Sequence, residues 1–132
     1  VAKKSLERLK EKVRELWEAR QSKTNQQMRD QWNRYVRGWT GYFRLAEDVR
    51  ALKRLEGWIR RHIRKFYWQR WHSAKGRLRA FRRLGLKERL WASARSSRGA
   101  WRMAATPAMQ QAISNARLRQ YGYLMPIMLM AR

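Results

Sequence analysis

Residues 46–71 read AEDVRALKRLEGWIRRHIRKFYWQRW and carry the clearest helical pattern in the chain. Apolar residues recur in this stretch at steps of three and four, which places their side chains on one face of a helix. These residues are Leu52, Leu55, Ile59, Ile63 and Phe66. Basic residues recur at steps of four and seven on another face, at Arg50, Arg54, Arg61 and Lys65. The pattern therefore predicts one long amphipathic helix with a buried face and a positively charged strip.

Two further helices are expected upstream. The first begins at Ser5 and has apolar residues at helical spacing within residues 6–17. The second begins at Thr24, where Gln27 three residues later completes the pattern of a capping box. Two glycines end or bend the second helix within residues 38–43, GWTGYF, which we expect to form a tight aromatic corner.

Shorter elements are expected after the long helix. In chain order they are helices over 76–84 and 87–94, a loop over 96–101 and a helix over 106–122. Gly85 and Gly122 are expected stops, and Thr106-Pro107 is a typical helix start. Residues 124–130 are apolar but interrupted by Pro126. We expect them to pack as a terminal plug against the core, or against a part of a longer protein outside this chain, rather than to anchor in a membrane.

The chain as a whole is predicted to be all-α. Three main helices in residues 1–72 form a helical bundle, and residues 73–132 add a smaller, basic helical extension. The chain starts at Val1, and we expect it to be a piece of a longer protein.

The charge balance predicts a polyanionic partner. The 132 residues include 33 Lys and Arg against 9 Asp and Glu, a net charge of +24. Residues 57–132 carry +17 of this net charge, with 18 basic residues and Glu88 as their one acid, and residues 1–56 carry +7. Nucleic acid is the first candidate partner and an anionic membrane surface the second. We expect the binding surface in the C-terminal part and the second half of helix 46–71.

The residues that catalysis or metal binding needs are sparse. The chain has no cysteine, which excludes disulfides and thiol catalysis. Its two aspartates are Asp30 and Asp48, whereas two-metal chemistry requires clustered carboxylates. His62 and His72 lack acidic or thiol companions nearby in the sequence. We therefore expect no catalytic site, no metal and no cofactor in this chain.

Aromatic residues are interleaved with the basic ones. Unpaired bases stack on aromatic rings and guanidinium planes while Arg and Lys hold phosphates. Core packing is favoured for the aromatic residues on predicted apolar stripes, which are Trp17, Trp32, Trp39 and Phe66. For Tyr67, Trp68 and Trp71, core packing and RNA stacking are equally open.

The stretch Val36-Arg37-Gly38-Trp39, followed after two residues by Tyr42-Phe43-Arg44, resembles the LRGWxxYFR motif of the group II intron maturase-specific domain. The opening 3–6 and the segment 55–61 resemble that domain as well, so the resemblance covers residues 3–71. Weaker likenesses at 83–86, 97–102 and 118–122 point to the tail that follows the domain in bacterial intron-encoded proteins. The chain departs from the family at 32–34, where Trp-Asn-Arg replaces Leu-Asn-Pro, and at Gly57.

The resemblance implies a thumb, or domain X, of a group II intron reverse transcriptase. Such a domain binds structured intron RNA, assists its splicing and retrohoming, and clamps the template–primer duplex next to polymerase fingers and palm. The resemblance implies two other partners, which are target DNA and a fingers and palm region in the same or a separate chain. It implies no membrane partner. The implied location is the bacterial cytoplasm or an organelle, in association with nucleic acid. No HNH endonuclease extension is visible in the sequence.

The motif and the basic runs together give the candidate RNA-binding residues. They are Arg37, Arg44, Arg50, Arg54, Arg60, Arg61, Arg64, Lys65, Arg70, Trp71, Arg77, Arg79, Arg82, Arg83, Arg98 and Arg102. Gly38, Trp39, Tyr42 and Phe43 correspond in the motif to a packing corner. The alternative to the maturase hypothesis is a basic nucleic-acid-binding or packaging protein without intron specificity.

Overall fold

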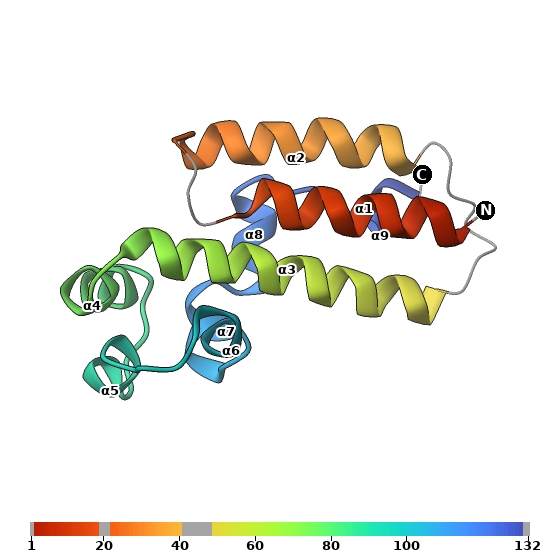
Figure 1. Cartoon of the computed structure of the whole chain (residues 1–132). Helices are drawn as coiled ribbons and strands as arrows, with labels where there is room; N and C mark the ends of the chain where they lie inside the picture. The colour runs from red at the N-terminus through yellow and green to blue at the C-terminus, as the bar shows by residue number, and fades with distance from the viewer. Residues whose placement is uncertain (1, 19–21, 41–48, 131–132) are drawn as a thin grey trace.

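The computed structural model describes residues 2–18, 22–40 and 49–130, and all regular secondary structure in these ranges is α-helical. The three long helices are α1 (Ala2–Leu16), α2 (Asn25–Thr40) and α3 (Val49–Trp71). They lie side by side, with α2 running opposite to α1 and α3 (Figure 1). This arrangement confirms the all-α prediction and its three main helices.

Short helices make up the rest of the described chain. They are α4 (Ala74–Arg83), α5 (Leu90–Ala94), α6 (Ala100–Ala104), α7 (Pro107–Ala112), α8 (Asn115–Gln120) and α9 (Pro126–Met130). Helix α6 packs along α3, and α9 packs against both α2 and α3. Helices α4 and α5 pack on each other beyond the C-terminal end of α3, away from α1 and α2 (Figure 1).

Several helix ends follow the local rules that the sequence indicated. Thr24 and Gln27 form the expected capping box, in which the Gln27 N–H donates to Thr24 Oγ1 at 3.1 Å and the Thr24 N–H donates to Gln27 Oε1 at 2.9 Å. Thr106 caps α7 ahead of Pro107. Gly85 follows α4 with a φ of +86°, a conformation that glycine adopts without strain.

Three predictions for the second half were wrong in detail. The helix expected over 87–94 begins only at Leu90, because Arg89 before it is left-handed, with a φ of 54°. Part of the expected loop over 96–101 is helical, since α6 begins at Ala100. The helix expected over 106–122 is broken at Ile113, whose ψ is 74°, and Ser114 then caps α8 by accepting a hydrogen bond from the Arg117 N–H. The predicted start of the long helix at residue 46 lies outside the described residues.

The aromatic core joins the two halves of the chain. Trp17 and Trp32 are fully buried, with ring centroids 5.2 Å apart. The Trp32 indole N–H donates to the Leu124 carbonyl at 2.8 Å, which ties the C-terminal segment to α2. Helix α9 begins at Pro126, and the Ile127 N–H donates to Glu56 Oε2 of α3 at 2.6 Å. The expected C-terminal plug is therefore confirmed.

The division into domains at residue 72 stays a prediction; His72 lies at the break between α3 and α4 and has a φ of 72°. Buried residues from both sides of this break belong to one hydrophobic cluster.

In the ranges that the structure describes, no helix combines the length and the apolar character needed to cross a membrane.

Candidate nucleic-acid interface

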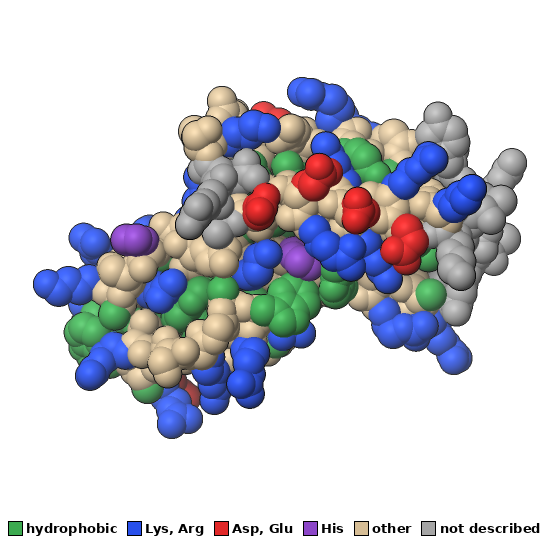
Figure 2. Space-filling model, in the orientation of Figure 1, with side chains coloured by type: hydrophobic (Ala, Val, Ile, Leu, Met, Phe, Trp, Pro, Cys, Tyr) green, Lys and Arg blue, Asp and Glu red, His purple; other side chains and the backbone are tan. Residues whose placement is uncertain are grey.

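Acidic side chains gather on one helix. Glu7, Glu11 and Glu15 are exposed along α1, and Glu18 follows them. Figure 2 shows these acidic groups as a row along α1. Over residues 49–130 the only exposed acid is Glu88. A polyanion therefore meets little repulsion over the surface that α3 to α9 form.

Exposed basic side chains are spread over the same acid-poor part. Those exposed within residues 49–130 are Arg50, Lys53, Arg54, Lys75, Arg79, Arg82, Arg83, Lys87, Arg89, Arg95, Arg98, Arg102 and Arg119, and we call them the basic surface. In Figure 2, Lys and Arg crowd the end of the molecule that carries α4 and α5. The basic surface includes three of the four expected site residues on α4, which are Arg79, Arg82 and Arg83, and it includes Arg50 and Arg54 on the first half of α3.

The second half of α3 uses its basic side chains differently. Arg64 is only 7% exposed, and its Nε donates to the Ile113 carbonyl at 2.6 Å while Nη2 donates to Asn115 Oδ1 at 2.7 Å. Burial, and secondarily the nearby Arg60, lowers the pKa of Arg64 to about 10. Arg61 donates from Nε to the Trp101 carbonyl at 2.9 Å and lies over the Trp101 ring. These guanidinium groups bind the C-terminal helices to α3.

Other expected contact residues are similarly engaged. Arg70 donates to the Lys23 carbonyl and lies over the Phe66 ring. Arg77 donates from Nε to the Trp68 carbonyl at 3.1 Å, with its guanidinium 3.9 Å from the Trp68 ring centroid. Arg77 thus ties α4 to the end of α3, and Arg70 ties α3 to the connection between α1 and α2.

Two half-buried basic groups of α3 also have partners within the helix. Arg60 forms an ion pair with the buried Glu56 at 3.1 Å. Lys65 Nζ lies 3.4 Å from His62 Nδ1, and burial lowers its pKa. The prediction that the binding surface includes the second half of α3 stays a prediction, and most of the basic groups there already have partners within the chain.

Carbonyl groups at helix C-termini are a recurring target of these arginines. The last carbonyls of a helix have no partner within the helix, and a cation there is favoured by the helix dipole. Arg64 binds such a carbonyl at Ile113, after α7. Arg29 binds the Tyr121 carbonyl after α8 at 2.9 Å, and Arg117 binds the Leu84 carbonyl after α4 at 3.2 Å. Sequence reasoning missed Arg29 and Arg117, because their partners are 92 and 33 residues away.

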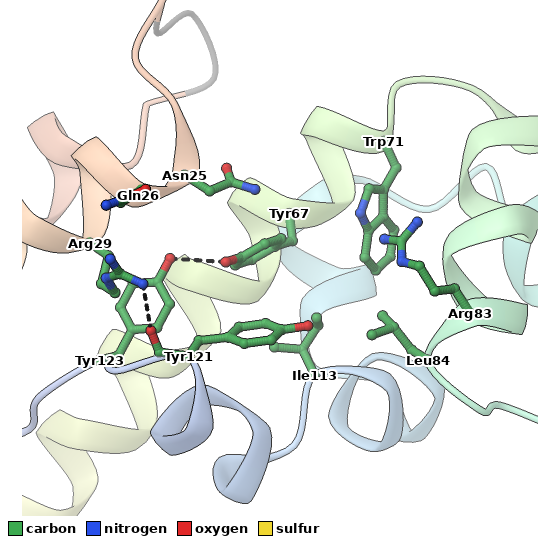
Figure 3. Close-up of a pocket in the computed structure, with 10 residues that line it drawn as sticks. All are labelled: Asn25, Gln26, Arg29, Tyr67, Trp71, Arg83, Leu84, Ile113, Tyr121 and Tyr123. Carbon is green, nitrogen blue, oxygen red and sulfur yellow. Dashed lines mark hydrogen bonds between the residues drawn. The ribbon is translucent and has the colours of Figure 1, made fainter.

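Burial decides between core packing and RNA stacking for two of the three aromatic residues that the sequence left open. Tyr67 and Trp68 are 8% and 2% exposed, so they pack in the core. Trp71 is half-buried and lines a pocket together with Arg83, another expected site residue (Figure 3). Trp17, Trp32, Trp39 and Phe66 are buried as expected.

His62 has an aromatic environment. Its ring lies 4.4 Å from that of Trp58 and 4.5 Å from that of Trp101, measured between centroids. Burial above all, and then the charges of Lys65, Arg14 and Arg61, lower its pKa to about 3. Across the described ranges, no group of three or more His, Asp or Glu residues is placed to hold a metal ion.

The motif residues divide between described and undescribed parts. Arg37 and Gly38 are exposed near the end of α2, and Trp39 is buried and donates from Nε1 to the Ser5 carbonyl at 2.9 Å. Tyr42, Phe43 and Arg44 lie outside the described residues.

Comparison with known proteins gives one family. Residues 6–85 match the family model described as group II intron, maturase-specific domain. The match runs from within α1 to the glycine after α4, more than half of the chain. No curated protein sequence matches the chain.

Proposed function

Because the chain belongs to the group II intron maturase-specific domain family, we propose that it binds structured intron RNA through its basic surface. The family gives the chain a maturase role in group II intron splicing. A maturase-specific domain is the non-catalytic part of intron-encoded reverse transcriptases. Splicing chemistry then belongs to the ribozyme, and the protein stabilises the folded RNA.

The observation that carries this proposal is the separation of charge on a scaffold of packed helices. Acidic groups line α1, whereas the basic surface shares its part of the described chain with one exposed acid, Glu88. Phosphate contacts of this kind give affinity and orientation but little reading of base sequence. Specificity for the intron would then come from matching the shape of the folded RNA.

We propose a smaller set of RNA-contact residues than the sequence suggested. Exposed members of the expected set remain in it, and they are Arg37, Arg50, Arg54, Arg79, Arg82, Arg83, Arg98 and Arg102. Arg61, Arg64, Arg70 and Arg77 leave it, because their guanidinium groups hold main-chain carbonyls. Arg44 keeps its place through the family motif alone.

We also propose that the domain acts as a thumb when polymerase fingers and palm are present, in the same or a separate chain. The family membership supports this role, since the thumb follows the palm in such proteins. Mixing the chain with candidate palm chains and measuring primer extension tests the thumb role, and an absence of association would contradict it.

We further propose that the chain acts on intron RNA in the bacterial cytoplasm or an organelle, with target DNA as a further partner.

Binding to intron RNA is tested by titrating the chain with a group II intron transcript and with an unrelated structured RNA of equal length. We expect tighter binding to the intron and a steep salt dependence. About 6–10 phosphate contacts would cost roughly 10³–10⁵ in affinity between 50 and 200 mM salt. Binding insensitive to salt would contradict the proposal, and equal affinity for both RNAs would favour the packaging alternative.

A further inference from the structure

A pocket of about 300 Å³ opens where five segments of the chain meet. They are the start of α2, the end of α3, the end of α4, Ile113 after α7 and the residues after α8 (Figure 3). Its volume lies at the lower end of the roughly 300–1,000 Å³ range of small-ligand sites. The pocket is therefore large enough for one small planar group.

Aromatic rings form one side of this pocket. The Tyr67 ring lies 6.5 Å from that of Trp71 and 6.1 Å from that of Tyr121, between centroids. Trp71 and Tyr121 are half-buried, so part of each ring is accessible. The Tyr67 and Tyr123 hydroxyl groups lie 3.0 Å apart, and burial raises the pKa of both phenols. The inner end of the pocket is thus aromatic and uncharged.

Polar groups with unused hydrogen-bonding capacity surround the aromatic side. Asn25 and Gln26 are exposed, and their side chains have no hydrogen-bond partner among the described residues. Each amide offers both a donor and an acceptor, as the edge of a nucleobase does. Arg83 reaches from α4 toward the Trp71 ring (Figure 3) and makes no hydrogen bond or ion pair within the described part of the chain. No acid is among the residues that line the pocket.

The Tyr121 wall is fixed to α2 before any ligand arrives. Arg29 donates to the Tyr121 carbonyl, and Asn33 Nδ2 donates to the Gly122 carbonyl at 2.8 Å. Gly122 has a φ of +94°, and a Cβ there would lie 3.4 Å from Arg29 Cδ, so a side chain would be strained and crowded. The Leu124 N–H completes the attachment by donating to Asn33 Oδ1 at 2.9 Å. Because these hydrogen bonds already order the Tyr121 segment in the free chain, ligand binding costs little further conformational entropy there.

We propose that this pocket takes up one unpaired nucleobase of a bound RNA. The base stacks on the accessible faces of Trp71 and Tyr121, its edge faces the amides of Asn25 and Gln26, and Arg83 binds the adjoining phosphate. Stacking on aromatic rings and guanidinium groups is how proteins recognise bases that have left a helix. This inference rests on the proposed function and adds a site for an unpaired nucleotide to the phosphate contacts.

The test uses the full chain and two RNAs of equal length and charge, a fully paired duplex and a hairpin with 2-aminopurine in its loop. We expect the wild-type chain to bind the hairpin more tightly and to quench the 2-aminopurine fluorescence by stacking. Tyr121→Leu should weaken hairpin binding by about 5-fold or more and abolish the quenching, because base stacking on one ring contributes on that order. Duplex binding should stay unchanged.

Tyr35→Leu is the matched control, since Tyr35 is also half-buried but lies on α2 beside Lys12, away from the pocket. It should leave both affinities and the quenching as in the wild type. The double variant Asn25→Ala, Gln26→Ala changes only exposed side chains and repeats the test should Tyr121→Leu fail to fold.

The outcomes separate the two proposals. Salt-dependent binding of both RNAs, with the pocket variants behaving like Tyr35→Leu, would overturn the nucleobase pocket and leave the proposed function intact. Failure of the wild-type chain to bind the hairpin, with binding of the intron transcript retained, would overturn the pocket alone. Failure to bind the intron transcript as well would overturn the proposed function and, with it, the pocket. Selective loss of hairpin binding in the pocket variants supports both.

Discussion

The arginines at the contact between α3 and the C-terminal helices differ from those on α4 in what their guanidinium groups touch. Arg64 is nearly buried and donates to a carbonyl and an amide oxygen. Arg79, Arg82 and Arg83 are exposed on α4 and have no hydrogen bond or ion pair to the described residues. The first region uses positive charge to close helix ends, and the second leaves it available to an outside partner.

This difference has a physical origin in the short helices of the C-terminal part. A helix of five or six residues has most of its carbonyls without an internal partner. A guanidinium group supplies several donors in a fixed plane, so one arginine can satisfy such carbonyls from another helix. Net charge therefore overstates the number of groups available to RNA.

The largest effect is expected when the contact region loses its buried guanidinium. Arg64→Ala should lower the free energy of unfolding by about 3 kcal/mol, because it removes two charged hydrogen bonds and leaves the Ile113 carbonyl unsatisfied. Urea denaturation measures the change. Arg79→Ala on exposed α4 is the control and should stay within about 0.5 kcal/mol of the wild type. Equal losses of unfolding free energy in the two variants would contradict the distinction between arginines that stabilise the fold and arginines that are available to RNA.

Acid should weaken the same contact region through His62. Its pKa is lowered to about 3 in the folded chain from an ordinary value of 6.5, so the unfolded chain binds more protons between these values. Stability is then full above pH 6.5 and is lost as the pH falls toward 3, by about 2 kcal/mol at pH 5.

His62→Phe removes this titration and should flatten the curve of stability against pH over that window. The comparison with wild type is needed because Glu56, whose pKa burial raises, changes stability in the opposite direction. Parallel curves for the two proteins would show that His62 is not the group responsible.

The outer face of α4 should affect RNA binding and leave stability alone. The triple change Arg79→Gln, Arg82→Gln and Arg83→Gln should weaken binding of intron RNA about tenfold at moderate salt and lower the slope of log affinity against log salt by about 2–3. Removing the same charge at exposed Lys4, Arg8 and Arg34 of α1 and α2 is the matched control. The reverse ranking of the two variants would place the interface on the N-terminal helices.

The smallest effect is expected at a neutral helix cap. Thr24→Ala removes the acceptor for the Gln27 N–H at the start of α2 and should cost about 1 kcal/mol of stability. RNA affinity should not change. If Thr24→Ala lowered the free energy of unfolding as much as Arg64→Ala, the buried arginine would contribute no more to stability than an ordinary helix cap.

The long helices and their buried faces could be predicted because local spacing determines them. Leu52, Ile59 and Ile63 are buried on α3 as their spacing indicated. The roles of individual arginines could not be predicted, since Arg64 meets Ile113 across 49 residues of sequence. The sequence placed Arg61 and Lys65 on a positively charged strip away from the buried face of the helix, where reversing their charge would change the surface alone. Both side chains are half-buried, and Arg61 holds the Trp101 carbonyl, so that change would disturb the fold.

The candidate site shows the same division. Spacing and the family motif indicated a basic helical domain. The exposed arginines of α4 belong to the basic run within residues 77–83, which is visible in the sequence. The pocket beside Trp71 gave no local signal, because its lining comes from residues as far apart as Asn25 and Tyr123.

Arginine-specific labelling with phenylglyoxal, read by mass spectrometry with and without intron RNA, tests the two classes of arginine most directly. We predict that Arg79 and Arg82 are modified in the free chain and protected by RNA, whereas Arg64 is unmodified in both states. Modification of Arg64 in the free chain with protection by RNA, or equal modification of the α4 arginines in both states, would contradict the account.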